Sequence, residues 1–128
     1  MPDNSDSYNL SGEDLVFVRT ALDALKEDLK DLLADQTKHV SAQWHIDLIS
    51  SVKKKLDNRE IQFSTDECRV MYVAALAMRD LMNKILDEKK SSEYDREMAR
   101  TTLHSANAMM RMLRKSFIEN GINVNEYL

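Results

Sequence analysis

Apolar residues recur every three or four positions along four separate stretches of the chain, and short polar stretches lie between them. This spacing places apolar side chains on one face of an α-helix. The sequence therefore predicts four amphipathic helices. They run from Ser11 to about Asp35, from Ser41 to Asp57, from Ser64 to about Glu88, and from the polar loop at 89–92 to about Asn120.

The residues predicted to face inward follow the same periodicity in each helix. They are Leu15, Val18, Leu22, Leu25, Leu29 and Leu32; Ala42, His45, Ile49, Val52 and Leu56; Cys68, Met71, Ala75, Met78, Met82 and Ile85; and Ala99, Leu103, Ala106, Met110, Leu113 and Phe117. Helices of this kind joined by short loops favour an all-α fold, an antiparallel up-down four-helix bundle. We expect residues 10–121 to form the bundle, residues 1–9 to be a disordered tail, and residues 122–128 to form a short extended tail that can dock.

Local signals mark several helix ends. Ser64 and Glu67 form the pattern of a capping box, in which each side chain bonds the other residue's backbone N–H. Ser11 is predicted as the N-cap of the first helix, and Gly121 as the left-handed residue that ends the fourth.

Composition narrows the class of protein. There are 2 Gly and 1 Pro in 128 residues, which disfavours phosphate-binding loops, sandwiches and barrels because their turns need glycine. The beginning of the sequence lacks the basic and apolar regions of a signal peptide, and no apolar run approaches the length of a membrane span. The single Cys68 cannot form an internal disulfide. We therefore expect a cytoplasmic protein that does not enter membranes.

Candidate chemistry is sparse. The three histidines, His39, His45 and His104, belong neither to an HExxH nor to an ExxH motif, so the metal sites typical of helical proteins are not indicated. Cys68 falls on an inward face, where a thiol is usually structural. The sequence predicts no catalytic residue, no metal and no cofactor, and favours a protein that is not an enzyme. An enzyme or metal protein with a site hidden in the bundle is the less favoured alternative.

Charged segments suggest partners only weakly. The net charge of −4 makes nucleic acid an unlikely partner, and the basic stretches 53–55 and 111–115 match helix ends, where cations are favourable. A nucleic-acid-associated protein stays open as an alternative. An acidic ridge repeats every four residues in the first helix and could mimic phosphates or meet a basic partner, or could simply be solvated. Its members are Asp23, Glu27, Asp31 and Asp35.

Methionine gives the strongest functional hint. Seven of the eight methionines lie in the last two predicted helices, and adaptable binding surfaces use methionine heavily. No residue from Val70 to Met78 is charged, which gives the third helix more apolar surface than one bundle interior needs. The predicted partner-binding face consists of Tyr72, Val73, Leu76, Met98, Met109 and Met112.

This face could be covered by a second copy of the chain, by a foreign protein, or by the residues that follow Gly121. The favoured function is a non-enzymatic helical module for protein–protein interaction: a small cytosolic regulator, adaptor or inhibitor that either forms a homodimer or docks a protein partner.

Overall fold

The computed structural model describes residues 12–60 and 62–119, and their fold is an all-α four-helix bundle, as predicted. The elements are α1 (Gly12–Lys30), the short 3₁₀ helix η1 (Asp31–Ala34), α2 (His39–Asp57), α3 (Thr65–Asp87) and α4 (Glu93–Glu119). The tails predicted at 1–9 and 122–128, and the helix ends predicted at Ser11 and Gly121, lie outside the described residues.

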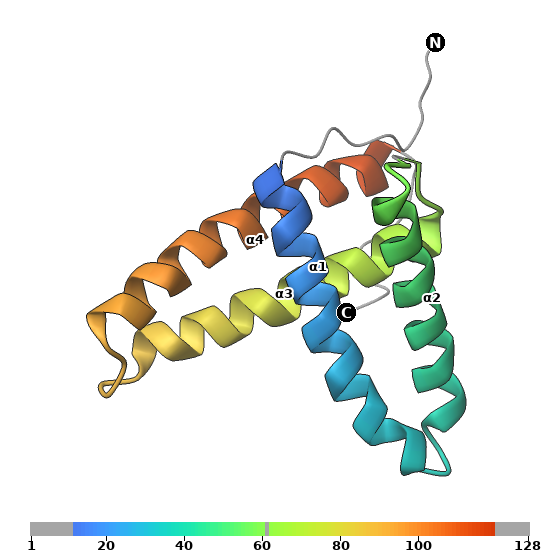
Figure 1. Cartoon of the computed structure of the whole chain (residues 1–128), viewed down its shortest axis with the longest axis horizontal. Coiled ribbons are helices and arrows are strands. Elements are labelled where there is room, and N and C mark those ends of the chain that lie inside the picture. The colour runs from blue at the N-terminus through green and yellow to red at the C-terminus, as the bar shows by residue number, and fades with distance from the viewer. Residues whose placement is uncertain (1–11, 61, 120–128) are drawn as a thin grey trace.

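The helices form two antiparallel hairpins, α1 with α2 and α3 with α4, and the two hairpins cross at a steep angle (Figure 1). Like α1, helix α3 packs against each of the other three helices, and α3 is the central element because its contacts with α4 and α1 are the most extensive. This position accounts for its apolar circumference: α3 is covered on several sides by its own chain.

The core lies where the hairpins cross. The largest fully buried side chains come from all four helices: Leu22, Ile49, Val52, Val70, Tyr72 and Leu113. The predicted inward faces of α3 and α4 are buried or pack against this core. One position in α2 differs, because Ile46 is buried and the predicted His45 is only half-buried.

The start of α3 confirms the predicted capping box. The Ser64 hydroxyl accepts a hydrogen bond from the Glu67 backbone N–H at 3.1 Å, and the Glu67 carboxylate accepts one from the Ser64 backbone N–H at 2.7 Å. Phe63, which precedes the cap, is buried. Two N–H groups that a helix start leaves unpaired are thereby satisfied.

The end of α2 is a Schellman motif built without glycine. The N–H of Glu60 bonds the carbonyl of Lys55 at 2.8 Å, and the N–H of Arg59 bonds the carbonyl of Leu56 at 3.1 Å. Arg59 has a φ of 58°, in the left-handed region that usually holds glycine or asparagine. The backbone therefore stores a small strain at this residue.

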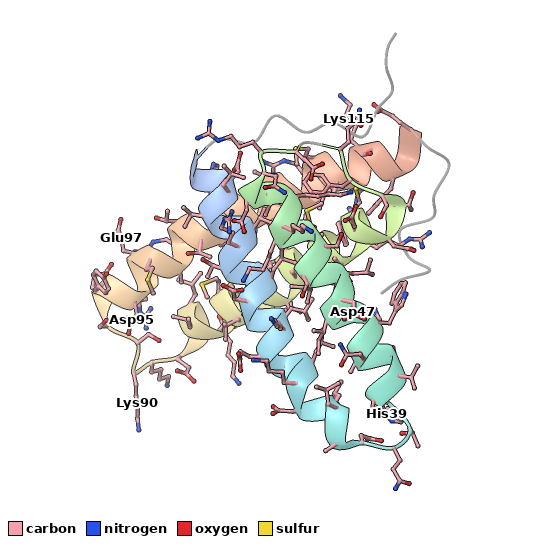
Figure 2. All side chains as sticks on the ribbon, turned by 45° about the vertical axis from the view of Figure 1, so that its right-hand side comes forward. His39, Asp47, Lys90, Asp95, Glu97 and Lys115 are labelled. Atoms are coloured by element: carbon pink, nitrogen blue, oxygen red, sulfur yellow. The ribbon has the colours of Figure 1, made fainter. Side chains whose placement is uncertain are left out.

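The α-helical part of α1 ends at Lys30, about one turn before the predicted end near Asp35. The chain continues as η1 and then turns at Asp35, whose carboxylate accepts bonds from the backbone N–H and the hydroxyl of Thr37 at 2.8 and 2.7 Å. Such local side-chain bonds compete with helix continuation. The outer end of this hairpin, where Figure 2 labels His39, extends away from α3 and α4.

Candidate functional site

A groove of about 220 Å³ lies between α2 and α3. Helix α2 contributes Trp44, His45 and Leu48 to its walls, and α3 contributes Asp66, Arg69, Val70 and Val73. The walls are therefore mainly apolar, with a few polar groups. Pockets of this composition are the usual binding sites of proteins.

Trp44 is the most prominent wall of this groove. Its side chain is 50% exposed, although large aromatic residues are usually well buried. The indole ring stands edge-on to the ring of His45, with centroids 4.9 Å apart. One helical turn earlier, Val40 is 71% exposed, so the apolar surface continues along α2 beyond the groove.

His45 supplies a hydrogen-bonding group beside the indole. Its Nδ1 lies 2.7 Å from the backbone carbonyl oxygen of Ser41. A carbonyl oxygen can only accept, so Nδ1 is the donor of this hydrogen bond. The lining of the groove thus includes two rings that carry hydrogen-bonding nitrogens, those of Trp44 and His45.

The charged residues in the groove's lining, Asp66 and Arg69, lie at the start of α3. Arg69 and Asp66 make an ion pair at 2.8 Å, one turn apart on α3. Asp47 does not line the groove; it is an exposed residue of α2 that accepts a hydrogen bond from Gln43 at 2.9 Å (Figure 2). An apolar floor with a polar rim is the usual anatomy of a protein-binding surface.

A buried polar network joins the two helices that form the groove. The Glu67 carboxylate is almost completely buried, and it accepts hydrogen bonds from the Lys55 ammonium at 2.6 Å and the Ser51 hydroxyl at 2.7 Å. Burial alone would raise the pKa of Glu67, but the bonds from Lys55, the Ser64 backbone and Ser51, together with the charge of Lys55, outweigh it and lower the pKa. The network holds α2 against α3 and so fixes the groove's walls.

The predicted partner-binding face is not one surface in this fold, and two of its six residues need correction. Tyr72 and Met109 are only 2% and 3% exposed because they pack inside the core that α3 and α4 share. Leu76 and Met112 are partly buried and pack against this core. Val73 lines the groove between α2 and α3, and Met98 is exposed near the start of α4.

The acidic ridge is interrupted in the structure. Asp23 pairs with Lys53 on α2, and Glu27 pairs with Lys30 at 3.1 Å. Asp31 lies in η1, and Asp35 lies in the turn that follows, where the Thr37 hydroxyl and N–H lower the pKa of its carboxyl. The four carboxylates do not continue one α-helical face, because the α-helix ends at Lys30. As a site for a basic partner the ridge stays a prediction.

Sequence reasoning missed the groove because it assigned only one apolar face to α2. A second row, Val40, Trp44 and Leu48, repeats every four residues beside the inward face. This second apolar row was the feature of the sequence that could have indicated a binding surface on α2. Helical periodicity places these side chains above one another on a face that a neighbouring helix covers only in part.

Comparisons with known protein families, curated proteins and solved structures give no match for this chain. None of the helices described in 12–60 and 62–119 has the length and apolar character needed to cross a membrane. Within the same residues, no three His, Cys, Asp or Glu side chains are grouped so that they could hold a metal ion. The inward-facing Cys68 is buried, as predicted.

Proposed function

We propose that this chain is a non-enzymatic protein-binding module, and that the groove between α2 and α3 takes a large apolar side chain of a partner polypeptide. The observation that carries the proposal is the half-exposed Trp44 in the wall of this groove. Tryptophan is among the residues most enriched at the energetic centres of protein interfaces. We infer that the protein acts as a small cytoplasmic regulator, adaptor or inhibitor.

The size of the groove favours a polypeptide over a small molecule. Pockets that engulf drug-sized ligands or cofactors have volumes of about 300–1,000 Å³, and this groove is smaller at about 220 Å³. The exposed Val40 extends the apolar surface past the groove along α2. A partner that inserts one anchor side chain and lies along α2 would cover both features.

The compartment is part of the proposal. The single cysteine is buried and cannot form a disulfide within the chain, which suits a reducing compartment such as the cytoplasm.

The proposal is tested with a displayed peptide library selected on the full chain and counter-selected on the Val73→Lys variant. We expect the enriched peptides to share a large apolar residue and to shift the emission of Trp44, the single tryptophan, towards the blue as they cover it. Val73→Lys and Trp44→Ala should each weaken binding at least about tenfold, the usual effect of losing an interface anchor. Tyr94→Ala is the matched control, because Tyr94 is an exposed aromatic residue on the other hairpin.

Two results would count against the proposal. Selected peptides that bind the Trp44→Ala variant as tightly as the parent would place the binding surface elsewhere. A failure to enrich any peptide would remove the support for a polypeptide partner.

Self-association is decided by light scattering on the parent chain. A dimer that Val73→Lys converts to a monomer of unchanged helicity would make a second copy the partner of the groove. A strict monomer at high micromolar concentration would exclude the homodimer.

A further inference from the structure

A second cleft lies on the α3–α4 hairpin and has a different chemical character. Its lining residues are Arg79 from α3 and Asn107, Met110, Arg111 and Arg114 from α4, and its volume is about 180 Å³. Three arginine side chains therefore line one small depression. The concentration of positive charge contrasts with the net charge of −4 for the whole chain.

The positive charge of this cleft is only partly neutralised. Asp80 pairs with Arg79 at 3.2 Å, but the Asp80 side chain is 67% exposed and the Arg79 side chain 36% exposed, and such surface pairs are weak. Arg114 bonds the hydroxyl of Tyr72, which carries no charge. Among residues 12–60 and 62–119, Arg111 and Arg114 have no carboxylate partner within ion-pair distance.

The core holds one of these guanidinium groups in place. Arg114 donates to the Tyr72 hydroxyl at 2.7 Å, and its guanidinium carbon lies 5.9 Å from the centre of the Tyr72 ring. Tyr72 is itself buried and packs edge-on against Phe117. A donor that is fixed before the ligand arrives loses less conformational entropy on binding.

We propose that this cleft binds a phosphate group, either as the free ion or as the phosphomonoester of a larger molecule. The planar guanidinium fork matches phosphate oxygens and donates two parallel hydrogen bonds to them. Arg111 and Arg114 are three residues apart on one helix, so their charges repel, and an anion between them relieves the repulsion. The small volume suits a single phosphate group.

A nucleic-acid strand fits this surface less well. Strand binding requires a basic track that follows many phosphates, and its strength grows with the number of phosphates that are neutralised. Here the arginines converge on one depression, and the exposed carboxylates of α1 and the net acidic charge oppose an extended polyanion.

The test is a titration of the ¹⁵N-labelled chain, in which NMR follows the side-chain Nε–H signals of the arginines. The probes are inorganic phosphate, a short phosphoserine peptide and its unphosphorylated counterpart, all at constant ionic strength. We expect saturable shifts at Arg79, Arg111 and Arg114 with inorganic phosphate and with the phosphoserine peptide, but not with the unphosphorylated peptide. If inorganic phosphate binds as tightly as the peptide, the ligand is the free ion or a small ester; tighter binding of the peptide identifies a phosphorylated side chain.

Arg111→Gln should weaken phosphate binding at least about tenfold, because it removes a charged hydrogen bond. Arg100→Gln is the matched control, since Arg100 lies on the same helix but is paired with Glu93 and Glu97. Arg111 is exposed, so its variant should keep the parent's helicity in circular dichroism.

Three results would overturn the proposal. The first is an equal response to chloride, and the second is an equal loss of binding in the Arg111→Gln and Arg100→Gln variants. The third is binding to a single-stranded oligonucleotide without binding to any phosphomonoester. The groove at Trp44 is separate from this cleft, so the two proposals can fail independently.

Discussion

The crossing of the two hairpins and the outer end of the α1–α2 hairpin are built from similar amphipathic helices, yet they bury their apolar residues to very different degrees. At the crossing, Leu22, Ile49 and Leu113 are completely inaccessible to solvent. At the outer end, which Figure 1 shows extending away from α3 and α4, η1 has no buried residue. There Leu33 is 39% exposed and Val40 is 71% exposed.

The difference shows that an apolar stripe becomes core only where a further helix covers it. At the crossing α3 packs against both α1 and α2, and α4 also packs against α1. Towards its outer end the α1–α2 hairpin extends away from α3 and α4 (Figure 1). Beyond this cover Leu33 and Val40 stay accessible, whereas Ala42 and Ile46 on α2 are buried, and Trp44 lies at this boundary. Binding surfaces are commonly found in such regions of lower local stability.

The largest expected effect comes from removing a core side chain at the crossing. Leu22→Ala should destabilise the fold by about 2–5 kcal/mol, since it deletes buried apolar atoms and leaves a cavity. Leu33→Ala at the outer end should change the free energy of unfolding by no more than about 0.5 kcal/mol. Urea denaturation measures the free energy of unfolding of both variants. Equal decreases in the two variants would contradict the difference between the two regions.

The polar network at the crossing gives the next effect. Glu67→Gln should destabilise the fold by about 1–3 kcal/mol, because Lys55 and Ser51 lose a buried carboxylate acceptor. Asp80→Asn, on the exposed side of α3, serves as control and should stay within about 0.5 kcal/mol of the parent. If the Glu67→Gln variant unfolded with the same free energy as the parent, the network would not be what holds α2 to α3.

The same carboxylate predicts a pH dependence. The pKa of Glu67 is lower in the folded chain than its ordinary value of 4.5, so the unfolded chain binds the proton more readily. The resulting stabilisation is complete above that value and is lost as the pH falls through the lower, folded pKa. Denaturation between pH 7 and pH 3 should show a smaller loss of stability in the Glu67→Gln variant than in the parent. Parallel profiles would contradict this origin of the effect.

Removing the cap of α3 should have a moderate effect. Ser64→Ala leaves the Glu67 backbone N–H without its acceptor, and loss of such a cap costs about 1 kcal/mol. Thermal melts of Ser64→Ala and Ser64→Asp test whether the missing N-cap bond causes the loss. Asp is also a good N-cap, so Ser64→Asp should keep most of the parent's stability.

The smallest predicted effect is a gain of stability. Arg59→Gly should stabilise the chain by up to about 1 kcal/mol, because glycine adopts the left-handed backbone conformation without the steric cost that arginine bears. The greater freedom of glycine in the unfolded chain offsets part of this gain. A destabilised Arg59→Gly variant would show that the arginine side chain contributes more than the relief of strain.

Periodicity was enough to predict the helices and most of the core. The inward face assigned to α4 is buried or partly buried throughout, and the capping box at Ser64 has the predicted bonds. These features depend on residues a few positions apart, so local sequence determines them. The end of α1 was misplaced because the turn at Asp35 and Thr37 competes with the helix, and the spacing of leucines does not report that competition.

Most of the candidate site could not be predicted from the sequence, because it depends on how the two hairpins cross. Tyr72 reads as an extra apolar residue on α3, and only the packing of α4 shows that it is core. Trp44 reads as one residue beside the inward face of α2, and only the position of α3 turns it into the wall of a groove. The angle between hairpins is set by side chains far apart in the chain, which helical periodicity does not encode.

The central claim is that one crossing holds the molecule together while the outer end of the α1–α2 hairpin stays open. Native-state hydrogen exchange, resolved by residue, tests it most directly within single helices. Amides at 49–52 in α2 and 19–22 in α1 should exchange only through global unfolding, whereas those at 43–45 and 27–30 should be less protected by orders of magnitude. Equal protection along the whole of α1 and α2 would contradict the account.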